Sequence, residues 1–279
     1  MLSIEDQMTT VYCFVDDFLK LNPSLSTWRR SPNDEPGFTD AEVITIGLLQ
    51  SCLGVATLKK TYRMIAANHR SAFPRLCSYG QWVARLHALT GIVGYLIQEG
   101  LKGHFMDGDL YILDSKPIPM CKPVRHGRVR LMRDDGANFG KNSVGWFFGF
   151  KLHLIIHHTG AILGAILTPA SWNDRDPALA LAWTTSGGVS LADLGYPGAE
   201  IEATLLEEAD MLLITPKHAT DPKTKALISS LRERIETINS QLAERFVDRV
   251  RSRSWNGLWN TIKLKMLHLN LCLAGLLTD

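Results

Sequence analysis

The chain has 279 residues, of which 46% are hydrophobic and 21% charged, and its formal net charge is +2. This composition is typical of an ordinary soluble globular protein with room for two domains or one large one. Charged residues interrupt every apolar run before it reaches the ~18–20 residues of a membrane span. Five scattered cysteines without CxxC spacing argue against a disulfide framework or a structural zinc site. We therefore expect a cytoplasmic protein without a membrane partner.

The first part of the chain is predicted to be helical. Apolar residues recur at helical spacing over residues 4–21, and Thr39 with Glu42 forms the capping box of a second helix. Further helices are expected over residues 58–67 and from Ser78 onward. Short helices with basic faces are typical of a helix-turn-helix module, but a small helical bundle with solvated lysines would show the same pattern.

Residues 110–114 are predicted to form a buried strand that ends at Asp114. Pro117 and Pro119 follow, and proline is excluded from the interior of a sheet because it lacks a backbone donor. A carboxylate at the tip of a buried strand is unfavourable unless it is compensated, and a metal ion is a common compensation. Asp114 is therefore the first candidate metal ligand.

The segment of residues 122–145 is polar and basic and follows neither the helical nor the strand period, so we expect a mobile basic loop. Such a run is usually a solvated surface, but beside a metal site it would contact the phosphates of DNA. Its candidate phosphate-binding residues are Lys122, Arg125, Arg128, Arg130, Arg133 and Lys141.

The rest of the chain alternates strands and helices, as in a mixed α/β fold. Residues 146–156 and 161–167 are predicted to form a hairpin. Helix, strand, helix, strand and a long amphipathic helix then follow, over residues 178–183, 189–192, 200–208, 210–215 and 228 onward. Arginines interleaved with tryptophans come next and add three candidate DNA contacts, Arg249, Arg251 and Arg253. A last apolar helix over residues 258–277 should pack on the core.

Two further acids occupy places that could bring them to Asp114. Asp193 follows the strand of residues 189–192, and adjacent parallel strands place their carboxyl ends side by side. Glu236 lies on the long amphipathic helix, which can cross the sheet to meet them. Converging carboxylates repel one another unless divalent cations lie between them, and oxygen ligands favour Mg²⁺ or Mn²⁺. Two such ions would suit in-line displacement at a phosphodiester.

Plainer interpretations of these acids stay open. Taken singly, each could be a turn or surface residue, and Glu236 could simply pair with Arg232 four residues before it. Asp174 and Asp176 compete with Asp193 for the second position, although their place before a helix favours capping.

Four segments, DSKPIPMC, FGFKLHLIIHHTGAILGAILTPA, ADLGYPG and RERIETINSQL, resemble successive motifs of bacterial insertion-sequence DDE transposases, of the insertion sequence 982 kind. FTDAEVITIGLL and FPRLCSYGQW resemble the helical region of that family, so the resemblance covers most of the chain. It implies a ribonuclease H-like mixed sheet flanked by helices over residues 109–279. It also implies a helical region over residues 1–108 that binds the DNA ends of the element.

The resemblance also implies a site and a reaction. The family's three acids match Asp114, Asp193 and Glu236, which would hold two Mg²⁺ (or Mn²⁺) ions, and Arg232 would orient Glu236 or contact phosphate. The implied enzyme cuts double-stranded DNA at the terminal inverted repeats of its element and joins the 3′-hydroxyls to target DNA. A homodimer on DNA, associated with the bacterial nucleoid, is implied as well.

The chain departs from the family at four positions. Ala192 and Leu194 stand where many relatives have Gly and Lys, and Ser229 and Ala243 stand where some groups have Tyr and Lys. Two alternatives therefore remain: a catalytically silent DNA-binding protein derived from a transposase, and a metal-dependent nuclease without strand transfer.

Overall fold

The computed structural model describes residues 2–28, 37–105, 108–128, 132–142, 144–185, 187–193, 196, 198–218, 220–249 and 251–278. Its contacts divide the chain into two compact units. We name them the helical unit, residues 1–101 with 250–279, and the sheet unit, residues 102–249. No helix within the described ranges is long and apolar enough to cross a membrane.

The helical unit is built from helices that begin at side-chain caps. Ser3, Thr39 and Ser78 each accept a hydrogen bond from the backbone three residues later, and all three form the full reciprocal capping box. The predicted box of Thr39 with Glu42 is confirmed, and the predicted helix of residues 4–21 has the predicted bounds. The helices of the unit are α1 Ile4–Leu21, α2 Asp40–Cys52, α3 Leu58–Asn68, α4 Tyr79–Ala88, α5 Thr90–Glu99 and α9 Trp255–Leu273.

The last helix, α9, belongs to this unit and not to the sheet. It packs against α2, α4 and α5, and Leu264 lies so close to Gly47 of α2 that an added Cβ at Gly47 would come within 3.0 Å of it. Asn260 of α9 donates a buried hydrogen bond of 2.9 Å to the carbonyl of Leu86 in α4. From the sequence alone, α9 is expected to belong to the sheet region of residues 109–279. Its apolar pattern shows that the helix is buried, but the pattern does not show which elements it packs against.

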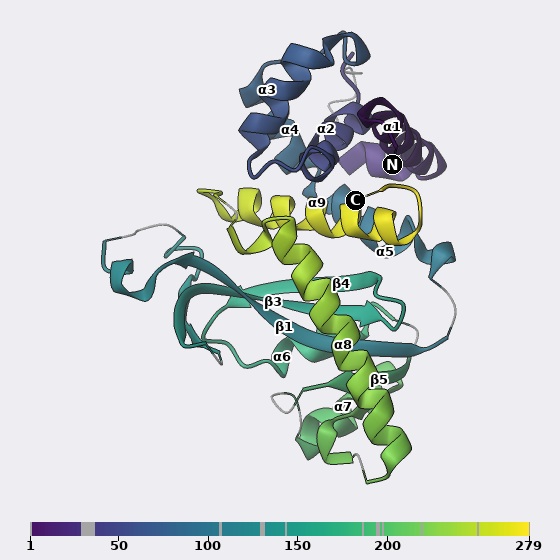
Figure 1. The fold of residues 1–279 in the computed structure, drawn as a ribbon, viewed down its shortest axis with the longest axis vertical. Helices are drawn as coiled ribbons and strands as arrows, with labels where there is room; N and C mark the ends of the chain where they lie inside the picture. The colour runs from purple at the N-terminus through teal and green to yellow at the C-terminus, as the bar shows by residue number, and fades with distance from the viewer. Residues whose placement is uncertain are drawn as a thin grey trace. The chain divides into compact units, whose positions relative to one another are not determined.

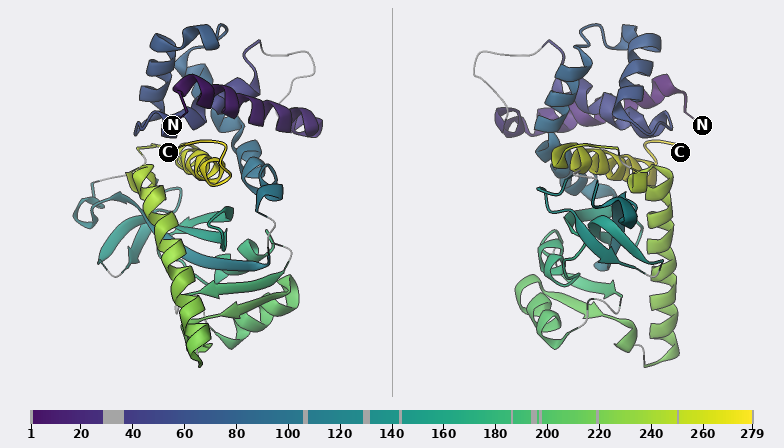
Figure 2. Two further views of the ribbon diagram at one scale, coloured as in Figure 1. Left: turned by 45° about the vertical axis from the view of Figure 1, so that its right-hand side comes forward. Right: turned by 90° about the vertical axis from the view of Figure 1, so that its left-hand side faces the viewer.

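The two ends of the chain meet within the helical unit (Figure 2). The Leu2 amide donates to the Thr278 hydroxyl at 3.2 Å.

The sheet unit contains one mixed sheet. Its strands are β1 Leu110–Cys121, β2 Asn138–Lys141, β3 Trp146–His157, β4 Ile162–Pro169, β5 Gly188–Ala192 and β6 Met211–Ile214. They lie in the order β2-β3-β1-β5-β6, and β4 also pairs with β3. The β1–β3 and β3–β4 pairs are antiparallel, whereas β1–β5 and β5–β6 are parallel, so the predicted hairpin and the predicted parallel neighbours are confirmed.

Helices cover both faces of this sheet. Tyr111 and Leu113 of β1 face a buried cluster with α6 Asp176–Ala182 and α7 Ala199–Ala209. Side chains alternate along a strand, so Ile112 and Asp114 point to the opposite face. The 23-residue helix α8, Pro222–Glu244, crosses that face (Figure 1).

Strand β1 is longer than predicted, because it continues through both prolines. Its parallel pairing with β5 ends at Leu113, and, among the described residues, residues 114–121 pair only with β3. Past that point β1 is an edge strand, where a missing backbone donor is tolerated. Asp114 therefore lies inside β1, at the place where its parallel neighbour ends, and not at the tip of the strand.

The basic segment of residues 122–145 was predicted to be irregular, and this is wrong in two places. Pro123–Arg125 forms a short 3-10 helix, and β2 pairs antiparallel with the start of β3. Four residues are too few for their period to be recognised in the sequence, so only pairing with β3 reveals β2.

Candidate active site

Asp114 lies on the sheet face that α8 crosses. Its carboxylate accepts a hydrogen bond of 2.8 Å from the side-chain amide of Asn239. Burial raises the pKa of Asp114 above its ordinary value, the hydrogen bonds from Asn239 and the Ser115 backbone lower it, and the carboxylates of Asp193 and Asp174 raise it again. The site is therefore unfavourable for an isolated anion and favourable for an anion that is paired with a cation.

Asp193 reaches this place through strand pairing. Leu113 of β1 stands opposite Ala192 of β5, so the next residue of each parallel strand is an aspartate. The Asp193 side chain is 57% exposed, and the guanidinium of Arg232 approaches its carboxylate at 3.7 Å. An ion pair this exposed contributes little to stability, so both groups are free to engage a ligand.

Glu236 is brought to the same place by the packing of α8. Asp221 caps the start of α8 by accepting from the amides of Lys223 and Thr224, and a row of buried apolar residues that includes Ile235 fixes the face turned to the sheet. Glu236 itself is exposed.

The end of α8 is fixed to β1 by a lysine. The Lys116 ammonium donates to the backbone carbonyl of Asn239 at 3.1 Å and pairs with the Asp248 carboxylate at 3.2 Å. The contact holds the segment that carries Glu236 and Asn239 against the strand that carries Asp114.

The three predicted acids line one pocket of about 140 Å³, together with Arg232. Its other walls are apolar: Ile112, Leu113, Leu191, Ala192, Ile228 and Ile235. Within the described ranges, no group of three or more His, Cys, Asp or Glu side chains is gathered closely enough to hold a metal ion. The acids therefore share the walls of one pocket without forming a closed ligand cluster.

Sequence reasoning missed two residues near the acids: Asn239, which contacts Asp114, and Tyr196, which lies in the buried cluster on the α6 and α7 face of the sheet. Asn239 comes one helical turn after Glu236, and this spacing was a signal that could have found it. Tyr196 is buried, and its hydroxyl lies near the side chain of Ser115. Burial raises the pKa of Tyr196 well above its ordinary value, the charges of Asp114 and Asp174 raise it further, and the contact with Ser115 lowers it.

The competing acids have other surroundings. Asp174 accepts from the Lys151 ammonium at 2.5 Å and lies 3.8 Å from His153. Burial lowers the pKa of His153 to about 4, although Asp174 alone would raise it, so the imidazole is neutral near pH 7. Asp176 is the first residue of α6, where its charge complements the helix dipole.

The predicted DNA contacts fall into three sets. Within the sheet unit all described candidate phosphate-binding residues of the basic segment are exposed: Lys122, Arg125, Arg128, Arg133 and Lys141. Arg251 and Arg253 are exposed in the helical unit. Arg130 and the side chain of Arg249 lie outside what the structure describes. Exposure makes the described residues available to phosphate, and their contact with DNA stays a prediction.

Comparison with known families adds one finding to this geometry. A family model described as "Transposase DDE domain" matches residues 105–255, just over half of the chain. The matched segment contains Asp114, Asp193, Asn239 and Glu236. No curated protein and no solved structure matches the chain.

Proposed function

Because the chain belongs to the family of transposase DDE domains, we propose that it is a DNA transposase that cuts the ends of an insertion sequence and transfers them to target DNA. The observation that supports this most directly is the pocket shared by Asp114 on β1, Asp193 just after β5 and Glu236 on α8. We assign the sheet unit a ribonuclease H-like fold of the insertion sequence 982 kind. A mixed sheet that carries the first acid on its central strand supports that assignment.

The donor set suits a hard divalent cation. All three acids offer oxygen, and the side-chain oxygen of Asn239 is buried beside Asp114 without a partner in the described ranges. Carboxylate and amide oxygens are the ligands that Mg²⁺ and Mn²⁺ prefer. Asp114, Asp193 and Glu236 would hold two such ions, which supply an activated attacking oxygen and stabilise the leaving oxygen.

The protein's own groups prepare the site for that chemistry. The amide of Asn239 fixes the orientation of the Asp114 carboxylate, and Lys116 holds the backbone of Asn239 in place. Arg232 balances the charge of Asp193, and its exposed guanidinium can turn to a DNA phosphate when Asp193 binds a cation.

The basic side chains define the proposed DNA partner. Lys122, Arg125, Arg128, Arg133 and Lys141 would contact the phosphates of double-stranded DNA at the catalytic site. The helical N-terminal region would bind the terminal repeats, in a homodimer assembled on two ends. This function would place the protein in the cytoplasm, in association with the nucleoid.

Substitution of the acids tests the proposal. Asp114→Asn and Glu236→Gln should each lower Mg²⁺-dependent cleavage of DNA carrying the element's ends by more than about 100-fold, since even supporting residues around a metal cost about 10–100-fold. Glu233→Gln, which changes an exposed acid on the same helix that does not line the pocket, is the matched control. Cleavage is measured on a labelled end fragment, and end binding by gel shift.

Each other outcome assigns a different function. Cleavage that survives both substitutions would show that the site lies elsewhere. A wild-type protein that binds the ends and never cuts them would be a silent DNA-binding protein, and Ala192 and Leu194 would be the first positions to restore to Gly and Lys. Cleavage without joining would identify a nuclease.

A further inference from the structure

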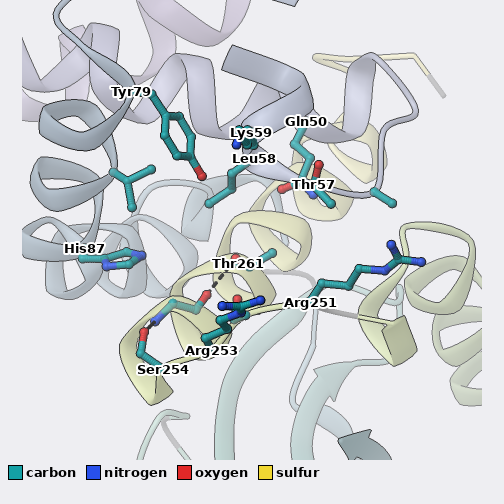
Figure 3. Close-up of a pocket in the computed structure, with 14 residues that line it drawn as sticks. Gln50, Thr57, Leu58, Lys59, Tyr79, His87, Arg251, Arg253, Ser254 and Thr261 are labelled. Carbon is teal, nitrogen blue, oxygen red and sulfur yellow. Dashed lines mark hydrogen bonds between the residues drawn. The ribbon is translucent and has the colours of Figure 1, made fainter. Parts of the chain in front are cut away.

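The helical unit contains a second and larger pocket. Its volume is about 370 Å³, within the range of pockets that bind small molecules. It is formed by the end of α2, the start of α3, one side of α4, and the start of α9 with the residues just before it (Figure 3). All residues that line it belong to the helical unit.

The side chain of Gln50 sets the chemistry of this pocket. It is only 1% exposed, and neither its amide nitrogen nor its amide oxygen has a hydrogen-bond partner in the part of the chain that the structure describes. A buried donor or acceptor without a partner destabilises the fold, so leaving both unsatisfied needs a reason. A ligand that offers an acceptor and a donor side by side would satisfy both atoms.

The rest of the lining is suited to a ligand with a negative charge. Lys59, Arg251 and Arg253 line the pocket with exposed side chains, and no Asp or Glu is among the described residues that form it. Thr57 and Ser254 cap the starts of α3 and α9 at the same pocket, so the positive ends of two helix dipoles add to the field.

Two ring side chains complete the walls. Tyr79 is half-buried and directs its hydroxyl into the pocket (Figure 3). The centroid of its ring lies 5.5 Å from that of Tyr62. His87 lies on the next turns of the same helix, and burial lowers its pKa, so its ring is neutral near pH 7. The pocket thus combines one amide, flat rings and a cationic rim.

We propose that this pocket binds a single unpaired nucleotide, with the edge of its base on Gln50 and its phosphate on Arg251 and Arg253. Nucleobases present adjacent donors and acceptors that a glutamine amide can contact in pairs, and stacking on aromatic rings tolerates any base. The nucleotide can come from a DNA strand or be free in solution. The inference rests on the proposed function only in that DNA would be the natural source.

The first test removes the amide of Gln50. Gln50→Leu in the full chain should weaken binding of a fluorescein-labelled single-stranded oligonucleotide by about tenfold, measured by anisotropy. Its melting temperature should stay the same or rise, because leucine buries no unsatisfied polar atom. Gln98→Leu, at an exposed glutamine of α5 outside the pocket, should bind like the wild type.

The second test addresses the phosphate. Arg253→Gln should weaken binding of every oligonucleotide alike and reduce the slope of log affinity against log salt by about one. Lys60→Gln is the control, because Lys60 is an exposed neighbour of Lys59 that does not line the pocket. Competition with free deoxyadenosine and thymidine monophosphates then separates the two sources. If the site is one for free nucleotides, these monophosphates should displace the oligonucleotide at concentrations similar to that of the oligonucleotide, and if it is one for a DNA strand, they should not.

The inference is overturned if Gln50→Leu binds oligonucleotides like the wild type, or if neither oligonucleotides nor mononucleotides bind. Binding assays without divalent cation keep this test separate from the proposed reaction. If Asp114→Asn binds normally while Gln50→Leu does not, the pocket stands whether or not the protein cuts DNA. If cleavage is confirmed while Gln50→Leu binds and cuts like the wild type, the pocket proposal fails alone.

Discussion

At the scale of single residues, the charge of Asp114 opposes the stability of the fold. Its ionised form is disfavoured by burial and by the carboxylates of Asp193 and Asp174, so its folded pKa exceeds the ordinary value of 3.8. A raised acid pKa means that ionisation destabilises the fold. That loss is absent below the ordinary pKa and fully present above the folded pKa.

Replacing this charge should therefore stabilise the protein when no divalent cation is present. Asp114→Asn in a chelating buffer should raise the melting temperature at neutral pH by about 2–4 °C, the effect of about 1 kcal/mol on a domain of this size. The gain should disappear as the pH falls through the folded pKa towards 3.8. Thermal melts over a pH series measure it, and Glu233→Gln should show no such gain.

Added Mg²⁺ should make the melting temperature of the wild type higher than that of Asp114→Asn. A ligand that binds only the folded state stabilises it, and the wild type would bind the ion more tightly than Asp114→Asn. Equal responses of both proteins to millimolar Mg²⁺ would count against Asp114 as a metal ligand.

Sequence reasoning reached the acids but not the residues around them. The convergence of Asp114, Asp193 and Glu236 could be predicted because strands and helix faces follow from local periodicity, although Asp114 lies inside β1 and not at its end. The place of Tyr196 could not be predicted, because it is buried among residues of β1, α6 and α7, and no local pattern encodes those contacts.

At the scale of elements, β1 and α8 together form the site. The prolines indicated that the strand could not continue inside the sheet. It continues instead as an edge strand that, within the described ranges, pairs with β3 alone. The amphipathic pattern of α8 predicted its buried face, but not that Lys116 would hold its end. A lysine in a strand gives no sign in the sequence of a partner 123 residues away.

The contact of Lys116 should fix α8 on the sheet. Lys116→Met should destabilise the sheet unit by about 1–3 kcal/mol, because it removes a charge-assisted hydrogen bond to the Asn239 carbonyl and leaves Asp248 without its cation. Hydrogen exchange should show lower protection at the end of α8. Lys223→Met, in the first turn of the same helix, should leave that protection unchanged. Unchanged exchange in both variants would show that apolar packing alone holds the helix.

At the scale of the whole molecule, the chain leaves the helical unit after residue 101 and returns to it at residue 250. The family match over residues 105–255 covers nearly the same inserted segment. The sequence composition could reveal the first boundary between the units, because helical patterns give way to strand patterns there. The second boundary lies between two helices, α8 and α9, so only tertiary contacts reveal it.

This organisation makes α9 a part of the helical core, and a core substitution there should affect that unit alone. Leu264 is 1% exposed, and its methyl groups lie beside Gly47 of α2. Leu264→Ala should destabilise the helical unit by about 2–5 kcal/mol, the usual range for a buried leucine, because the rigid neighbours cannot fill the cavity. Asn256→Ala, at an exposed position of α9, should have little effect.

Region-resolved hydrogen exchange distinguishes the two units in that experiment. Amides of α2 and α4 should lose protection in Leu264→Ala, while those of β1 and β3 keep it, because stability is local to cooperative units. A uniform loss over both regions would instead show that the chain unfolds as one unit. In that case the last thirty residues would couple the helical unit to the sheet unit, and substitutions in α9 should lower the proposed cleavage as well as stability.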